Sequence, residues 1–319
     1  MLFQERLMQA ECVVCGHEID ECWHESDSKT ERLLMIGMCP RCGLVQQLFQ
    51  PTREVLDQYY RKEYRLDYKE TYTPKSKHVY RAMNVAKDRL GFMARAGLRS
   101  TGASLLDVGC GGGEFCAVAG KMGIKAKGVD LNEGYANYAK TELGVDVMTG
   151  SIDDVLGQEY DVITMFHVLE HLPSPEATVR SLWYRLKPTG HVVIEVPNIH
   201  QNDASPHNIY FKALLHYFSH SSLRCVMSRY FYPVYWEDEG NLKAVFKKRA
   251  EPREELVYPD ATELQTTRQR LREKGWVEYL FAGGGLRKPF RKLTNSVDEL
   301  RVRQMRPAEL LRLTMSMSN

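Results

Sequence analysis

A glycine-rich stretch, LLDVGCGGGEF from Leu105 to Phe115, places four glycines within five residues directly after an apolar run. A turn of this kind after a strand usually lets a ligand contact the backbone, because glycine has no side chain to keep the ligand away. A dinucleotide-binding turn needs the pattern G-x-G-x-x-G, but its last position falls on Glu114 or Cys116 here. No G-K-[ST] follows, so the stretch also lacks the signature of a P-loop.

Two carboxylates accompany this loop. Asp107 lies two residues before the first glycine, where a negative charge repels a phosphate and attracts an ammonium group. Asp130 ends the next expected strand, where a carboxylate can accept hydrogen bonds from both hydroxyls of a ribose. S-adenosylmethionine is a ligand that both acids could bind, because it has a ribose and a positive group but no phosphate. The structural alternatives are a helix cap at Asp107 and a simple strand end at Asp130.

The first fifty residues contain two C-x-x-C-G units with 23 residues between them. Each unit points two thiolates toward one place, so two units supply the four sulfurs of a tetrahedral zinc site. Four cysteine ligands leave no open coordination position, which indicates a structural zinc. The alternative is four free cysteines or redox pairs, and His17, Cys22 and His24 are interpreted as bystanders. The predicted ligands are Cys12, Cys15, Cys39 and Cys42.

The elements that must position these residues alternate between short apolar strands and helices from Ser104 onward. Such alternation predicts a parallel doubly wound sheet, whose ligands bind at the carboxyl ends of the strands. An antiparallel hairpin is predicted over 229–248, with its turn near Asn241. The expected strands are 104–109, 124–131, 145–150, 160–168 and 191–198, and the expected helices are 112–123, 133–144 and 175–190.

Three segments closely resemble class I S-adenosylmethionine-dependent methyltransferases: LLDVGCGGGEF, GVDLNEGYANYAK and the stretch from Tyr160 to Asn198. The resemblance runs from about Ser104 to Pro197, and more loosely to about Lys248. The cysteine units and the segment after them resemble a subset with an N-terminal zinc-binding segment, which often modifies sugars or other polar metabolites. The resemblance implies an α/β fold with a mostly parallel, seven-stranded Rossmann-like sheet, a small zinc ribbon before it and a helical extension behind it.

The resemblance also implies which residues surround the cofactor. The glycine loop with its acid is expected to hold the methionine part, and the end of the second strand the ribose. Residues after the third strand would flank the adenine, and residues after the fourth would lie beside the sulfonium. In chain order, these residues are Asp107, Gly109, Gly111, Gly113, Asp130, Leu131, Ser151, Ile152, Phe166 and His167.

Methyl transfer to an oxygen requires a group that removes the proton of the acceptor, and histidine is best matched to this task near neutral pH. We predict His167, after the fourth strand, and His216, in the segment HYFS after the fifth strand, as catalytic bases. Glu170 and His171 are interpreted as structural residues of the turn, with His171, His207 and the tyrosines before Ser76 as the next candidates. Some relatives with glutamate at position 167 bind a divalent ion, so His167 argues against a catalytic metal.

The chain divides into four expected parts. Helical spacing of apolar residues predicts a packing helix over 78–97, and Tyr59, Tyr60 and Tyr64 before it are candidates for a lid. The parts are a zinc-ribbon segment (1–50), a helical linker or cap (51–100), the S-adenosylmethionine-binding methyltransferase domain (101–250) and a basic helical extension (251–319).

The composition is that of an ordinary globular protein. Of the 319 residues 43% are hydrophobic and 26% charged, and the formal net charge of +2 does not indicate a nucleic-acid partner. No window of 18 uninterrupted apolar residues predicts a membrane-spanning helix, and the N-terminus does not resemble a secretory signal. The cytoplasm is the expected compartment.

The expected function is S-adenosylmethionine-dependent methyl transfer to a small polar acceptor. A hydroxyl of a sugar or glycan is favoured over nitrogen or carbon. Two alternatives are a methyltransferase that acts on nucleic acid through the zinc ribbon and basic tail, and a non-catalytic scaffold. Residues 265–319 carry 12 Lys or Arg against 5 Asp or Glu. An anionic membrane surface is therefore a further hypothesis for the extension, as is a homodimer.

Overall fold

The structure is a computed structural model that describes residues 10–30, 32–51, 53–59, 74–98, 101–157, 159–288 and 299–316. Tyr60 and Tyr64, two of the residues predicted for a lid, lie outside the described residues. None of the described helices is both long and apolar enough to span a membrane.

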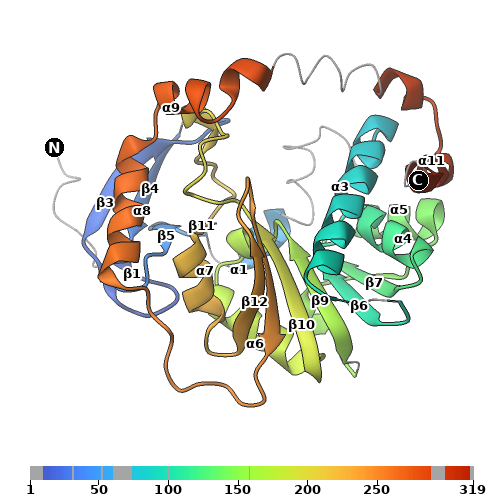
Figure 1. Cartoon of the computed structure of the whole chain (residues 1–319), viewed down its shortest axis with the longest axis horizontal. Coiled ribbons are helices and arrows are strands. Elements are labelled where there is room, and N and C mark those ends of the chain that lie inside the picture. The colour runs from blue at the N-terminus through green and yellow to red at the C-terminus, as the bar shows by residue number, and fades with distance from the viewer. Residues whose placement is uncertain are drawn as a thin grey trace.

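A seven-stranded sheet forms the centre of the fold, as predicted (Figure 1). Its strand order is β12-β13-β10-β9-β6-β7-β8, and the strands from β10 to β8 are parallel. The hairpin of β12 and β13 adds to β10 in antiparallel fashion. The strands are β6 (Ser104–Val108), β7 (Lys125–Asp130), β8 (Val147–Thr149), β9 (Tyr160–Phe166), β10 (Leu186–Val196), β12 (Phe231–Glu237) and β13 (Leu242–Lys248).

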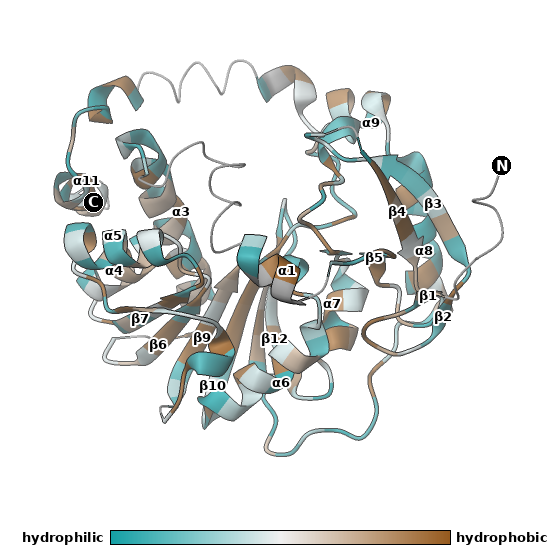
Figure 2. Cartoon of the chain, turned by 180° about the vertical axis from the view of Figure 1, so that it is seen from behind, coloured by the Kyte–Doolittle hydropathy of each residue, from teal (hydrophilic) through white to brown (hydrophobic). Residues whose placement is uncertain are grey.

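Helices cover both faces of this sheet, because successive residues of each strand point to opposite faces. Leu105 of β6 packs with one set of helices, whereas its neighbour Leu106 packs with the other. Figure 2 shows the central strands as mostly hydrophobic, which fits burial on both faces. The first set comprises α3 (Ser76–Arg95), α4 (Glu114–Lys121) and α5 (Glu133–Leu143), and the second α6 (Pro175–Arg185) and α7 (His220–Met227).

Most predicted elements are confirmed, including the helix before the glycine loop, but α6 is shorter than predicted. It ends at Arg185, and Leu186 already pairs with Tyr160 of β9. Pro188 explains the difference, because proline in a helix interior removes a hydrogen bond and clashes with the preceding turn. Residues up to Gly190 therefore belong to an irregular start of β10.

The N-terminal segment forms a second sheet that includes one strand from the chain after β10. Its order is β11-β5-β4-β3, and His216 of β11 pairs with Gln46 of β5. Cys39 and Leu44 belong to the same hydrophobic cluster as residues of the central sheet. The strands of this sheet are β3 (Glu21–Ser26), β4 (Leu33–Met38), β5 (Val45–Gln47) and β11 (His216–Tyr217), and β1 (Ala10–Glu11) pairs with β2 (Glu18–Ile19) in a separate two-stranded sheet.

The C-terminal extension packs on both parts of the molecule. Helix α8 (Ala261–Glu273) lies along the N-terminal sheet, where Arg268 pairs with Glu21 at 2.8 Å (Figure 1). Helix α11 (Pro307–Ser316) packs against α3. Between them lies the short α9 (Trp276–Phe281), which leaves apolar side chains exposed to solvent.

The four predicted zinc ligands converge on one place. All four sulfurs lie within 4.8 Å of one another, and none is in a disulfide. The Sγ atoms of Cys12 and Cys42 are 3.4 Å apart, close to the separation of about 3.8 Å that follows from tetrahedral Zn–S bonds of about 2.3 Å. The glycine after each unit, Gly16 or Gly43, has a left-handed backbone that closes the turn. The residues present therefore fit a structural zinc ion.

We expect purified protein to contain about one zinc ion per chain. Cys39→Ser should lower the zinc content and raise amide hydrogen exchange over residues 10–48, because binding energy at such sites is folding energy. Elemental analysis and exchange mass spectrometry measure both effects. Cys22→Ser is the matched control, because Cys22 is exposed and outside the cluster. Wild-type protein free of zinc after purification without chelator would contradict the prediction.

Candidate active site

A cavity of about 390 Å³ opens at the carboxyl ends of β6, β7, β8 and β9. This edge is where parallel α/β sheets bind ligands, as the sequence pattern predicted. Polar and apolar groups both line it. Among the predicted cofactor residues, those at the cavity wall are Gly109, Asp130, Leu131, Ser151, Ile152 and His167.

Asp130 is fixed in this wall by two backbone donors. Its Oδ2 accepts a hydrogen bond from the N–H of Gly111, and its Oδ1 one from the N–H of Asn132, both at 2.8 Å. Each carboxylate oxygen has a second lone pair, so both can still accept from a ligand. Position 109 of the loop requires glycine, because a Cβ there would lie 2.4 Å from a methyl group of Val168. The loop and the acid therefore form one pre-organised unit.

Asp107 was predicted to contact the cofactor, but its side chain does not lie at the cavity wall. The side chain is only 3% exposed and accepts a hydrogen bond from the hydroxyl of Thr164 at 2.7 Å. Burial raises the pKa of Asp107 to about 7, although the bond from Thr164 and the charge of Arg89 oppose the shift. The carboxyl is thus an internal support beneath the loop.

Three other predicted cofactor residues also lie outside the cavity lining. Phe166 packs edge-on against Phe115 at 4.8 Å between ring centroids, with the guanidinium of Arg89 over its face. Gly113 allows two helices to approach, because a Cβ there would lie 2.8 Å from that of Ala139. Gly111 contributes through its bond to Asp130.

His167 has a left-handed backbone, with φ of 57°, unlike any other non-glycine residue that the structure describes. Such a conformation costs roughly 1–3 kcal/mol and persists only where surrounding contacts enforce it. Here its N–H donates to the carbonyl of Glu195 at 2.8 Å. Strain of this kind is concentrated at functional sites, and His167 lies at the cavity wall.

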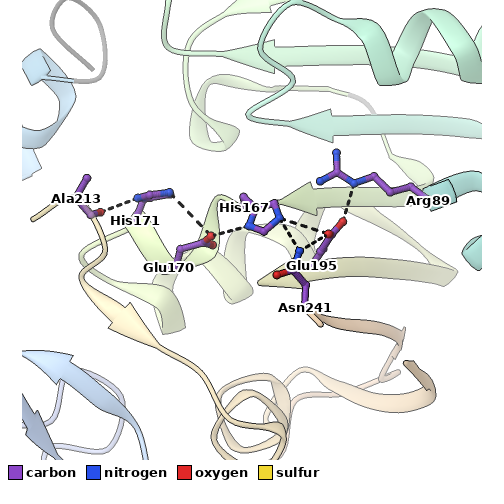
Figure 3. Close-up of polar contacts among 7 residues, drawn as sticks. All are labelled: Arg89, His167, Glu170, His171, Glu195, Ala213 and Asn241. Atoms are coloured by element: carbon purple, nitrogen blue, oxygen red, sulfur yellow. Dashed lines mark hydrogen bonds and ion pairs between the residues drawn. The ribbon is translucent and has the colours of Figure 1, made fainter. Parts of the chain in front are cut away.

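The ring of His167 lies between two buried glutamates (Figure 3). Its Nδ1 is 3.3 Å from Oε1 of Glu170, and its Nε2 is 3.4 Å from Oε1 of Glu195. Asn241 lies 3.1 Å from the same Nε2 and donates to Glu195 at 2.8 Å. Arg89 closes the network with a 2.6 Å ion pair to the other oxygen of Glu195. With His167 protonated, the two positive charges of His167 and Arg89 balance the two negative charges of the glutamates.

This network does not favour the predicted role of His167 as a general base, which stays a prediction, because both neighbouring carboxylates favour the protonated ring. Burial disfavours the charged ring, but Glu170 and Glu195 outweigh burial and raise the pKa of His167 to about 9. The ring therefore holds its proton at neutral pH. In turn, His167 and Arg89 outweigh the effect of burial and hold the pKa of Glu195 below its ordinary value.

The second predicted base, His216, is not among the residues that line the cavity, whereas His167 is. It is buried in β11, and its Nε2 lies 2.9 Å from the carbonyl oxygen of Leu172. Burial lowers its pKa to about 4. This position does not favour His216 as the base, which stays a prediction, and its contact with Leu172 joins β11 to the turn after β9. His207, a further candidate, is exposed beside the ring of Trp276.

His171, interpreted from the sequence as structural, lies in the cavity wall. Its Nδ1 is 2.6 Å from the carbonyl oxygen of Ala213, so this nitrogen carries the hydrogen (Figure 3). The neutral ring then has its lone pair on Nε2, which lies 4.0 Å from Oε1 of Glu170. Among the imidazoles considered for the base, His171 combines a place at the cavity with a tautomer able to take a proton.

Sequence reasoning missed Arg89, Glu195 and Asn241. Each comes from a different element and becomes relevant only through its contact with another member of the cluster. Glu195 alone carried a local signal, because a charged residue inside an otherwise apolar central strand needs a buried partner.

We expect the His167 cluster to make stability depend on pH. The pKa of about 9 in the folded state exceeds the ordinary histidine pKa of 6.5, so the stabilisation is fully present below about pH 6.5 and is lost as pH rises through 9. Urea unfolding measures the free energy of unfolding of wild type and His167→Gln at pH 6, 7.5 and 9.5. The difference between the two proteins should become smaller as pH rises. His207→Gln is the control for replacing a histidine. A difference that stays constant or grows with pH would refute this account.

Comparison with known proteins supports a family assignment. Residues 78–232 match the family model described as a methyltransferase domain. A ubiquinone biosynthesis O-methyltransferase of Nitrosospira multiformis is 34% identical over 118 residues, which cover 34% of this chain and 49% of that protein. One from Pseudomonas entomophila is 31% identical over 105 residues, 30% of this chain and 45% of that protein. The chain thus spans about half the length of these curated relatives.

A solved structure shares the fold. Magnesium protoporphyrin IX methyltransferase from Synechocystis PCC 6803 with bound SAH superposes with a TM-score of 0.51 at 13% identity, covering 62% of this chain and all of that one. At this identity the likeness establishes the fold alone. Residues 78–232 thus match a methyltransferase domain, and the central sheet has the fold of this solved methyltransferase structure.

Proposed function

We propose that the protein transfers a methyl group from S-adenosylmethionine to a hydroxyl of its acceptor. The observation that carries the proposal is the unit of glycine loop and Asp130 at the mouth of the sheet. Its carboxylate has lone pairs toward the cavity and offers the acceptor pair that a ribose diol needs. The family match and the names of the O-methyltransferase relatives point the same way.

Different residues of the cavity would hold different parts of the cofactor. Asp130 would accept from the ribose hydroxyls, and the apolar side chain of Ile152 would contact the adenine. The open backbone at Gly109 would face the methionine part. When bound, S-adenosylmethionine supplies a methyl group on a positively charged sulfur, which an oxygen can take by in-line displacement.

His171 is our candidate for the group that takes the acceptor proton. The bond to Ala213 fixes its ring and its tautomer, so Nε2 can receive a proton without reorienting the ring. His167 stays charged beside it, and its two glutamates keep the cluster near neutral in total charge. His167 would thus orient Glu170 and the turn that carries His171 and take no part in proton removal.

The remaining expectations about acceptor and partners stay predictions. The sequence pattern favours a sugar or glycan hydroxyl, with nucleic acid and a non-catalytic scaffold as alternatives. A contact of the basic extension with an anionic membrane, a homodimer and a cytoplasmic location are hypotheses from sequence as well. Cofactor binding without product from any acceptor would favour the scaffold. RNA binding that weakens steeply with salt would favour nucleic acid.

Asp130→Asn should weaken the binding of S-adenosylhomocysteine by about 1–3 kcal/mol, roughly 5- to 150-fold, the loss expected for hydrogen bonds to a charged group. Titration calorimetry measures the affinity. Asp146→Asn is the control, because Asp146 is exposed just before the edge strand β8 and pairs with Lys127 of β7. NAD binding, or equal affinity in Asp130→Asn and wild type, would sink the assignment.

His171→Gln should slow methyl transfer by roughly 10²–10⁴-fold, the usual contribution of a general base. Affinity for S-adenosylhomocysteine should stay nearly intact, because the proposed role concerns the acceptor. Release of S-adenosylhomocysteine in single-turnover reactions measures the rate, and His207→Gln is the control. Equal rates for His171→Gln and wild type would exclude His171 as the base.

A further inference from the structure

A second cavity, of about 610 Å³, adjoins the first. It lies between β4, the segment after β5 and helix α1 (Arg53–Gln58). Pro51 lines both cavities. Ala213 lines the second, and its carbonyl accepts the hydrogen bond from His171, whose ring lines the first. The candidate base therefore lies in the wall between the two cavities.

The wall of the second cavity is mostly apolar. Leu33, Phe49 and Val55 all line it, yet they are 66%, 67% and 56% exposed. Large apolar side chains exposed around one hollow indicate a surface that a ligand covers. Figure 2 shows hydrophobic residues on both β4 and α1, the elements that flank the hollow. A free sugar would gain little from such a wall, because its hydroxyls need hydrogen-bonding partners.

The charged side chains among the described residues of this lining are cationic. Arg32 and Lys212 line it, and no carboxylate occurs among the described residues of the lining. Lys212 lies over the ring of Tyr59, with 5.3 Å between its Nζ and the ring centroid. A cationic rim on an apolar hollow is complementary to a ligand that joins an anionic group to an apolar body.

The N-terminal segment fixes the position of this wall. Gln47 at the end of β5 is buried, and its Nε2, which carries two hydrogens, lies 2.7–3.2 Å from three carbonyl oxygens of one turn, those of Phe211, Lys212 and Leu214. The carbonyl of Ala213 belongs to the same turn. The cysteine-bearing segment thus builds the second cavity and aligns the partner of His171.

We propose that the second cavity binds the methyl acceptor, and that this acceptor is a hydroxylated molecule with an apolar body and an anionic group. The inference rests on the proposed function. The acceptor oxygen forms a bond to the methyl carbon while the bond between that carbon and sulfur breaks, with its electron pair left on sulfur. The hydroxyl proton passes to Nε2 of His171 and from there to solvent.

Two fluorescent probes with the same ring system test the chemistry of the cavity. Anilinonaphthalene sulfonate is an aromatic anion, and N-phenyl-1-naphthylamine lacks the sulfonate. With S-adenosylhomocysteine present, the full chain should bind anilinonaphthalene sulfonate more tightly than N-phenyl-1-naphthylamine. Val55→Asp should weaken binding of the anion about 10-fold or more, because it removes apolar contact and adds a like charge. Val85→Asp is the matched control, because Val85 is an exposed valine on α3 outside the lining.

A second variant tests the charge separately. Arg32→Gln should weaken binding of the anionic probe several-fold and leave that of the neutral probe unchanged. In acceptor assays, hydroxylated aromatic acids should release S-adenosylhomocysteine and free sugars should not. Equal effects of Val55→Asp and Val85→Asp, no preference for the anion, or turnover of sugars alone would overturn the inference.

The cofactor titration separates this inference from the proposed function. Normal binding of S-adenosylhomocysteine by Val55→Asp and Arg32→Gln shows that both variants are folded. Probe results that contradict the inference then leave the methyltransferase proposal standing. Failure of the wild-type chain to bind S-adenosylhomocysteine would instead refute the proposed function itself.

Discussion

The short pairing of β5 with β11 is the contact on which the arrangement of the two cavities depends. It joins a strand of the cysteine-bearing segment to one that follows the central β10. On its other side, Leu215 donates to the carbonyl of Glu170, and His216 contacts that of Leu172. Backbone bonds thus run from the N-terminal sheet to the turn that carries His171. A buried, uncharged His216 suits this task, because a charged ring would be costly to bury.

The features that the sequence predicted correctly are those set by local patterns. Alternating apolar runs and helical spacing defined the central sheet, and the paired C-x-x-C-G units defined a cluster whose members meet without help from distant residues. The place of Asp130 at the cavity also follows from a local pattern, because the end of a parallel strand next to a glycine loop faces one edge of the sheet; its bond to a ribose stays a prediction.

The roles of the histidines could not be predicted in the same way, because they depend on partners far away in sequence. His167 follows a strand end as a catalytic base would, but Glu195 and Glu170 convert it to a cation. Asp107 has the spacing of a ligand contact, yet its side chain points to Thr164 and is buried. Spacing locates a side chain along an element, whereas burial and charge partners decide its protonation.

The order of strands in the N-terminal sheet has a consequence for synthesis of the chain. The four cysteines all lie between residues 12 and 42, but β11 follows only at residues 216–217. Until then β5 is an edge strand with unpaired backbone groups, which invites wrong pairings in a nascent chain. A metal bound by the cysteines would hold β1 to β5 together during this interval, well before the strand that completes the sheet leaves the ribosome.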